Sequence, residues 1–153
     1  MAGRTDSASR IIGATPEAIY DAFVDPEAQM RWLPPEGMTG KFDRFEPWSG
    51  GHYRLTLTFS GEHATAGKSS ADADTVEGRL VELIPGKRIV QTADFESDDP
   101  AYAGTMTMTW SLRAVPDGTE VTITASDVPS GISAEDHAQG LASTLANLAD
   151  FLE

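Results

Sequence analysis

The stretch TMTMTWSLRAVPDGTEVTITA, residues 105–125, decides the fold class. Apolar and polar side chains alternate on both sides of Pro116-Asp117-Gly118, which is typical of two antiparallel strands joined by a tight turn. Each strand therefore has one apolar and one polar face. We expect a sheet that packs on the core with one face and meets water with the other.

The same alternation extends upstream over much of the chain. Residues 53–59 alternate in this way, and Pro85-Gly86 is the turn between two further candidate strands. The predicted strands are 4–13, 41–48, one that begins at His52 after Ser49-Gly50-Gly51, 76–84, 87–95, and the two within 105–125. This order predicts an antiparallel meander. Ser60–Asp74 and Glu96–Ala103 have no period, and the first is predicted to be a mobile loop.

Two short helices are expected between the first and second strands. Residues 15–18 (TPEA) and 25–28 (DPEA) each place a capping side chain before a proline, with an acid in the first turn. These signals predict helices over 16–24 and 26–32. Leu33-Pro34 ends the second helix, because a residue that precedes proline avoids helical geometry. Both helices are too short to be stable alone, so they must pack on something larger.

A long helix is expected at the end of the chain. Ser133 is a candidate cap, and leucines at 141, 145, 148 and 152 form one apolar stripe over about twenty residues. Such a helix is ~30 Å long, and the inner face of the sheet is the concave apolar surface that can receive it. The predicted fold class is α+β: an about seven-stranded curved antiparallel sheet wrapped on the C-terminal helix, with two short helices after the first strand. We expect a single domain, 1–153, with residues 1–3 disordered.

Composition limits the classes of function. The chain has 153 residues, no Cys, and 24 acidic against 11 basic side chains, which gives a net charge of −13. Without Cys there are no disulfides, thiolate nucleophiles or Cys-based metal sites. The acidity argues against binding to nucleic acid or to an anionic membrane, and no apolar run approaches the roughly 18 residues of a membrane span. The first ten residues lack the apolar core of a signal peptide, so we expect a cytoplasmic protein.

Several short motifs occur in an order that resembles a known family. They are TPEA at 15–18, Asp25-Pro26 followed by Trp32, Trp48 before Ser49-Gly50-Gly51, Gly78-Arg79-Leu80 leading into Pro85-Gly86-Lys87, the strand 107–112 and the helix 137–153. From about Arg4 to Glu153 the chain resembles the SRPBCC (START/Bet v-like) superfamily, and within it the branch named after the activator of heat shock protein 90 ATPase homologue. The resemblance implies a helix-grip fold with a deep cavity between sheet and long helix, often holding an apolar small molecule. Its members include lipid carriers, hormone receptors and aromatic polyketide cyclases, so the fold does not settle the chemistry.

The apolar strand positions would form the wall of such a cavity. Methionines suit an adaptable wall, because their side chains fill irregular shapes. The resemblance supports Trp32 as closing the cavity from the side of the short helices. The alternative is that these side chains simply fill the core. The candidate ligand-binding residues are Trp32, Tyr53, Leu57, Phe59, Met106, Met108, Trp110, His137, Leu141 and Leu145.

His137 is the polar residue of greatest interest. It lies four residues before Leu141 on the stripe that faces the sheet, in a first turn where the helix dipole favours a neutral ring. It is either a group at the cavity mouth that binds a ligand or acts as a general base, or a partly exposed residue without such a role. The adjacent Asp136 points off this face and is not expected to orient the ring. No metal site and no cofactor are expected, since the spacing of His and carboxylate residues matches no ligand pattern.

Three functions remain open at this point. The first is binding of an apolar small molecule, neutral or weakly cationic, because the acidic residues lie outside the cavity stripes. The second is a cyclase/dehydratase-like enzyme that uses His137 with Tyr53 or Asp94, and against it no acid and base can be placed together. The third is a stress-related or co-chaperone interaction protein. A chaperone partner is not expected, because the chain lacks the separate N-terminal domain of such co-chaperones, and a homodimer is left open.

Overall fold

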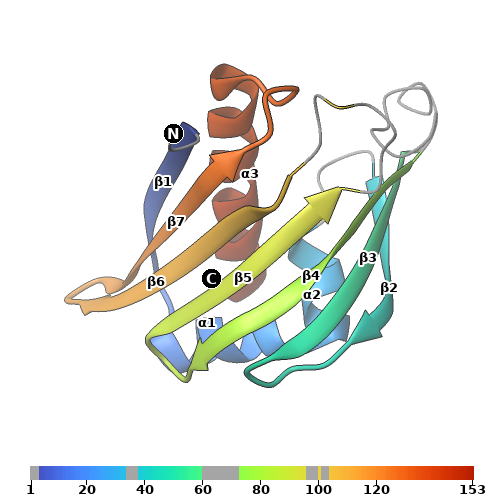
Figure 1. The fold of residues 1–153 in the computed structure, drawn as a ribbon. Coiled ribbons are helices and arrows are strands. Elements are labelled where there is room, and N and C mark those ends of the chain that lie inside the picture. Colours follow the sequence, from blue (N-terminus) through green and yellow to red (C-terminus); the bar gives the residue numbers. More distant parts are fainter. Residues whose placement is uncertain (1–3, 34–37, 60–72, 96–99, 101–103) are drawn as a thin grey trace.

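One seven-stranded antiparallel sheet curves around a long C-terminal helix in the computed structural model (Figure 1). The structure describes residues 4–33, 38–59, 73–95, 100 and 104–153. The elements are β1 (Arg4–Ile12), α1 (Pro16–Val24), α2 (Pro26–Trp32), β2 (Met38–Phe45), β3 (Gly51–Phe59), β4 (Ala73–Ile84), β5 (Arg88–Phe95), β6 (Met106–Val115), β7 (Gly118–Val128) and α3 (Ala134–Leu152). Strands β2 to β7 pair in chain order, and β1 adds to the far edge beside β7. The predicted α+β helix-grip fold is confirmed.

The two short helices begin where their capping residues predict. The Thr15 hydroxyl accepts a hydrogen bond from the Ala18 amide at 3.1 Å. The Asp25 carboxylate accepts from the Glu27 amide at 3.0 Å and from the Ala28 amide at 3.4 Å. These bonds satisfy amide groups that the first helical turn leaves without a partner, so both predicted helix ranges are correct.

The predicted strand 41–48 is wrong at both ends, because β2 runs from Met38 to Phe45. A tight turn follows it, in which the Trp48 amide bonds the Glu46 carbonyl and the Gly51 amide bonds the Trp48 carbonyl. The Glu46 carboxylate accepts from the His52 amide at 2.8 Å and holds the turn closed. Trp48 therefore projects from the turn and is 59% exposed.

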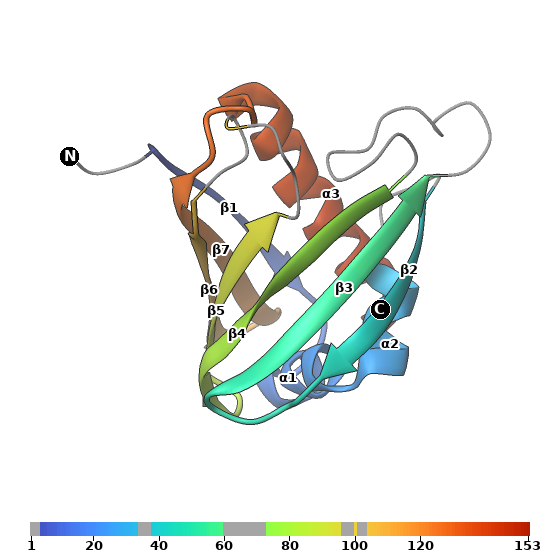
Figure 2. The same ribbon diagram turned by 45° about the vertical axis from the view of Figure 1, so that its right-hand side comes forward.

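The core lies between the inner face of the sheet and α3, which crosses the hollow of the sheet (Figure 2). Leu141, Leu145 and Leu148 of α3 are buried, as the apolar stripe predicts. Residues 134–140, by contrast, are exposed except for His137. The helix thus packs tightly through its second half, and its first two turns stand further from the sheet.

Three aromatic rings join α1 and α2 to the sheet. Phe23 of α1 and Trp32 of α2 both contact Trp110 of β6 in edge-to-face geometry, with ring centroids 5.3 and 5.8 Å apart. Such pairs stabilise a fold beyond the apolar area they bury. The Trp32 indole N–H donates to the Ala22 carbonyl at 3.1 Å, so its polar atom is satisfied inside the core.

Some predictions concern residues that the structure does not describe. The expected disorder of residues 1–3 lies outside the described residues, as do residues 60–72 of the predicted mobile loop and most of the segment 96–103. The end of that first segment belongs to β4, which begins at Ala73.

A glycine in β4 tests the packing of the sheet. A Cβ atom on Gly78 would lie 1.9 Å from the Thr92 carbonyl oxygen, so Gly78→Ala must push β4 and β5 apart. We expect this variant to lower the free energy of unfolding by about 1–3 kcal/mol, measured by urea denaturation. The matched control is Gly140→Ala in α3, where a Cβ would meet no atom within 4 Å. Because alanine favours a helix more than glycine does, that variant should be as stable as the parent or more so by up to about 1 kcal/mol.

Candidate functional site

A cavity of about 270 Å³ lies between α3, α2 and the inner face of the sheet. Its wall is mostly aliphatic and aromatic, with a few uncharged polar side chains. None of the described residues that line it is Asp, Glu, Lys or Arg. The lining residues are Phe23, Gln29, Leu33, Phe42, Phe45, Tyr53, Leu55, Leu57, Val76, Leu80, Gln91, Ala93, Phe95, Met106, Met108, Trp110, Ile123, His137, Gly140, Leu141 and Thr144.

The structure places most of the candidate residues around this cavity. The candidate strand residues that line it come from β3 and β6, and the candidate residues of α3 recur at helical spacing on one face. The candidates in the wall are Tyr53, Leu57, Met106, Met108, Trp110, His137 and Leu141. Phe59 ends β3, and its side chain lies outside the described part of the chain.

Two candidates lie elsewhere. Trp32 is 1% exposed and does not line the cavity, because its ring packs between α1 and the sheet against Phe23 and Trp110. The suggestion that it closes the cavity is therefore wrong, and the alternative that it packs the short helices on the sheet is correct. Leu145 is also fully buried and outside the lining, one turn beyond Leu141 where α3 meets the sheet.

The cavity reaches the surface beside the first turns of α3. Gly140 belongs to its wall and is also exposed, and a Cβ there would meet open space. The side chains of His137 and Thr144 lie one turn before and one turn after Gly140 on the same helical face. A small molecule can therefore approach the apolar interior past this glycine.

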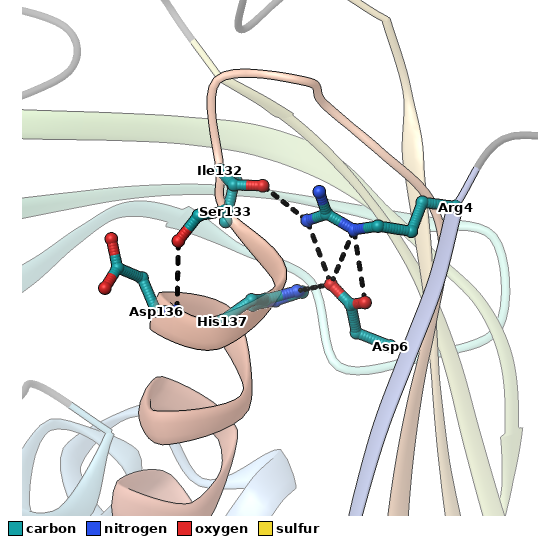
Figure 3. Close-up of polar contacts among 6 residues, drawn as sticks. All are labelled: Arg4, Asp6, Ile132, Ser133, Asp136 and His137. Carbon is teal, nitrogen blue, oxygen red and sulfur yellow. Dashed lines mark hydrogen bonds and ion pairs between the residues drawn. The ribbon is translucent and has the colours of Figure 1, made fainter.

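His137 is held by a carboxylate from the opposite end of the chain (Figure 3). Its Nδ1 lies 2.7 Å from Oδ2 of Asp6 in β1, and the two side chains are only 12% and 10% exposed. Arg4 binds the same carboxylate through Nε at 3.1 Å and Nη2 at 3.0 Å, and it also donates to the Ile132 carbonyl. One carboxylate thus ties the start of β1 to the start of α3.

The electrostatics keep Asp6 ionised. Burial on its own raises the pKa of Asp6, but the hydrogen bonds from His137 and Arg4 and the positive charge of Arg4 outweigh burial and lower that pKa below its ordinary value of 3.8. An ionised Asp6 accepts the proton on Nδ1 of His137, and in that tautomer of the ring the lone pair lies on Nε2. His137 can therefore accept a hydrogen bond or a proton through Nε2.

The expectation that no acid and base can be placed together is wrong, because it considered Asp136 and overlooked Asp6. Asp136 lies in the first turn of α3, where its amide donates to the Ser133 cap at 3.1 Å. Asp6 shares the inward-facing alternate positions of β1 with the half-buried Ala8. That alternation is the signal that identifies Asp6, and a register shift between β1 and β7 occurs beside it.

Tyr53 and Asp94, the other two residues of the enzyme hypothesis, do not join this pair. Burial raises the pKa of the Tyr53 phenol far above its ordinary value of 10.0, and its hydroxyl donates to the Thr92 carbonyl at 2.5 Å. Asp94 is exposed on the alternate face of β5, where it accepts from the Thr105 hydroxyl. Neither residue is available to a molecule in the cavity as an acid or base.

The remaining polar groups of the wall differ in how they are satisfied. The Gln91 Oε1 atom accepts from the Trp110 indole N–H at 3.0 Å, and the Thr144 hydroxyl donates to the Gly140 carbonyl at 2.9 Å. Gln29 of α2 is 3% exposed. Among the described residues, its Oε1 is the one buried side-chain nitrogen or oxygen atom without a hydrogen-bond partner. No feature of the sequence around Gln29 sets it apart from an ordinary helix residue.

Two further observations concern the described residues only. Within them, no three His, Asp or Glu side chains gather in a way that could hold a metal ion. No helix in the same set is long and apolar enough to cross a membrane.

A family model described as Activator of Hsp90 ATPase homolog 1-like protein matches residues 13–153. The chain belongs to this family. The match confirms the resemblance to this branch of the SRPBCC superfamily. None of the curated proteins matches the chain in sequence.

Solved structures support the assignment. A crystal structure of a protein from Chromobacterium violaceum shares 32% sequence identity, covers 97% of this chain and 96% of its own, and has a TM-score of 0.84. A protein from Rhodobacter sphaeroides shares 21% identity over 99% of this chain and 96% of its own, with a TM-score of 0.79. An AHSA1-like protein from Aeromonas hydrophila, determined by NMR, shares 17% identity over 97% and 91%, with a TM-score of 0.74. The last two show the shared fold alone.

Replacement of the carboxylate tests the link between β1 and α3. Asp6→Asn removes the charge that binds His137 and Arg4, and we expect a loss of about 1.5–3 kcal/mol in the free energy of unfolding at neutral pH. The pKa of Asp6 is lowered on folding, so the stability from its charge is present above pH 3.8 and is lost as pH falls through the folded pKa. The stability difference between parent and variant should therefore shrink below pH 3.8.

Urea denaturation between pH 7 and pH 2.5 measures this difference. The control is Asp117→Asn, which alters an exposed carboxylate in the turn between β6 and β7. The control should stay within about 0.5 kcal/mol of the parent at neutral pH. A difference for Asp6→Asn that stays constant across this pH range would contradict the ionised pair.

Proposed function

We propose that this protein binds a neutral, largely apolar small molecule in the cavity under α3. The observation that carries the proposal is the cavity itself, about 270 Å³ of apolar-walled space that reaches the surface beside Gly140. Protein interiors are close-packed, and voids larger than a water molecule are few. A space of this size in a 153-residue chain would lose packing energy unless a ligand fills it.

The size of the cavity indicates the size of the ligand. An apolar cavity of about 150 Å³ stays dry and accepts benzene. The present cavity is larger by somewhat less than twofold, which suits a two-ring molecule or an alkyl chain of similar volume. Met106 and Met108 in its wall can adjust to either shape.

The wall also selects against charge. An ionised ligand would lose its hydration without gaining an opposite charge from the described lining, and burying an unpaired charge is strongly unfavourable. The net charge of −13 repels anions before they reach the opening. Both effects favour a neutral ligand.

A cavity-filling variant tests the proposal. Ala93 of β5 is 3% exposed and lines the cavity, so Ala93→Leu would place its added carbons in that space. We expect the dissociation constant for N-phenyl-1-naphthylamine, an uncharged dye that joins a naphthalene to a phenyl ring, to rise at least about tenfold, a loss of roughly 1.4 kcal/mol. Dye fluorescence measures binding. The thermal midpoint should stay within a few degrees of the parent, because filling empty space does not strain the core.

The control for this variant is Ala142→Leu on the exposed side of α3, outside the lining. It adds the same atoms and should bind the dye as the parent does. The proposal is wrong if the parent binds no dye, or if Ala93→Leu binds it with unchanged affinity.

The His137–Asp6 pair favours a second candidate function, acid–base catalysis on a ligand in the same cavity. His137 lines the cavity, and Asp6 holds its Nδ1 proton at 2.7 Å, which leaves Nε2 as a base. Orientation of a histidine by a buried carboxylate is a recurrent arrangement for proton transfer. A bound ketone with an acidic C–H group is the simplest substrate class that such a base could act on.

Deuterium exchange tests this second function. 1-Tetralone, a neutral two-ring ketone, would exchange its α-hydrogens in D₂O about 10²-fold faster with the protein than in buffer. NMR follows the loss of signal. His137→Gln should return the rate to that of buffer, whereas His52→Gln, on an exposed histidine of β3, should leave it unchanged. An exchange rate that does not differ between the parent and His137→Gln rules out a catalytic His137.

A further inference from the structure

Gln29 differs from the other polar residues of the cavity wall. It lies in α2, is 3% exposed, and its Oε1 has no hydrogen-bond partner among the described residues. Gln91 and Thr144 of the same wall are bonded to Trp110 and to the Gly140 carbonyl. The wall therefore contains one primary amide that the protein itself leaves unsatisfied.

An unpaired amide in an apolar interior destabilises the folded state, because it gives up its hydrogen bonds to water. Buried polar atoms of native proteins are nearly always bonded, so an exception needs a cause. A leucine at this position would avoid the loss and would still pack on the core. The glutamine is therefore unfavourable for folding of the ligand-free protein.

The helix does not need this side chain. The main-chain N–H of Gln29 donates to the Asp25 carbonyl at 2.9 Å, and the main-chain carbonyl of Gln29 accepts from the Leu33 amide at 2.8 Å. Asp25 caps the start of α2, and the ring of Trp32 anchors its end. The main-chain groups of Gln29 are thus bonded, and the start of α2 is capped, without the side-chain amide of Gln29.

We propose that Gln29 is the specificity-determining residue of the cavity and that its amide binds a hydroxyl group on the ligand. The inference rests on the proposed small-molecule binding and names the ligand more closely, as a neutral apolar skeleton that carries a hydroxyl. A carboxamide turned by 180° exchanges its oxygen and nitrogen, and a hydroxyl both donates and accepts, so it pairs with the amide in either orientation. A hydroxyl is also uncharged, as the described lining requires.

Two ligands of nearly equal size separate this hydrogen bond from the apolar contacts. 2-Naphthol carries a hydroxyl where 2-methylnaphthalene carries a methyl group. Displacement of N-phenyl-1-naphthylamine gives the dissociation constant of each, and their ratio is the preference for the hydroxyl. We expect this preference to be about tenfold larger in the parent than in Gln29→Leu, because the variant has lost the partner of the hydroxyl.

The matched control is Gln139→Leu on the exposed side of α3, outside the lining. It makes the same replacement where the side chain meets water, so the variant should keep the parental preference. A second readout needs no ligand. The thermal midpoint of ligand-free Gln29→Leu should exceed that of the parent, because the variant no longer buries an unpaired amide.

The possible failures are distinct. If both naphthalenes bind the parent but Gln29→Leu keeps the same preference, the role of Gln29 is overturned and the binding function stands. If neither displaces the dye from the parent and the dye itself does not bind, the binding function fails and the inference fails with it. A lower thermal midpoint for ligand-free Gln29→Leu would show that the amide serves the fold, and would also overturn the inference.

Discussion

A long straight helix can touch a curved sheet along only part of its length. In this fold the contact falls on the second half of α3, where Leu145 and Leu148 are almost fully buried and Ala149 is completely so. The first two turns stand over the hollow of the sheet, and the cavity occupies the space that results. These turns are fixed in place by Asp6, which binds His137 from the edge strand β1. The cavity thus follows from the geometry of the fold. The interaction between Asp6 and His137 fixes the position of the helix turns beside its opening.

The course of the chain was predictable because its signals are local. Alternation defines the strands, and Thr15 and Asp25 mark two helix starts through side chains that bond amides two or three residues away. The end of β2 was mispredicted because the sequence signals a turn only at Ser49-Gly50-Gly51, whereas the observed end depends on Glu46 bonding the amide of His52. The intrinsic structural preferences of Glu46 and His52 do not predict this hydrogen bond.

The site was predictable only where it follows the same alternation. Tyr53, Met106 and Trp110 line the cavity because they share the apolar face of their strands. Asp6 and His137 are 131 residues apart, and their contact depends on how α3 crosses β1. Gln29 was not predicted as a site residue, for a different reason. Its importance lies in a missing partner, and only the packing around a side chain shows whether a partner is missing.

The three tryptophans occupy three different environments, and this gives the protein built-in optical probes. Trp48 is exposed at a turn, Trp32 is sealed between α1 and the sheet, and Trp110 forms part of the cavity wall with its indole N–H on Gln91. A molecule that enters the cavity meets the wall that contains Trp110, whereas neither Trp32 nor Trp48 lines the cavity. The emission of the native chain therefore contains one component from the cavity wall, beside one from an exposed and one from a buried tryptophan.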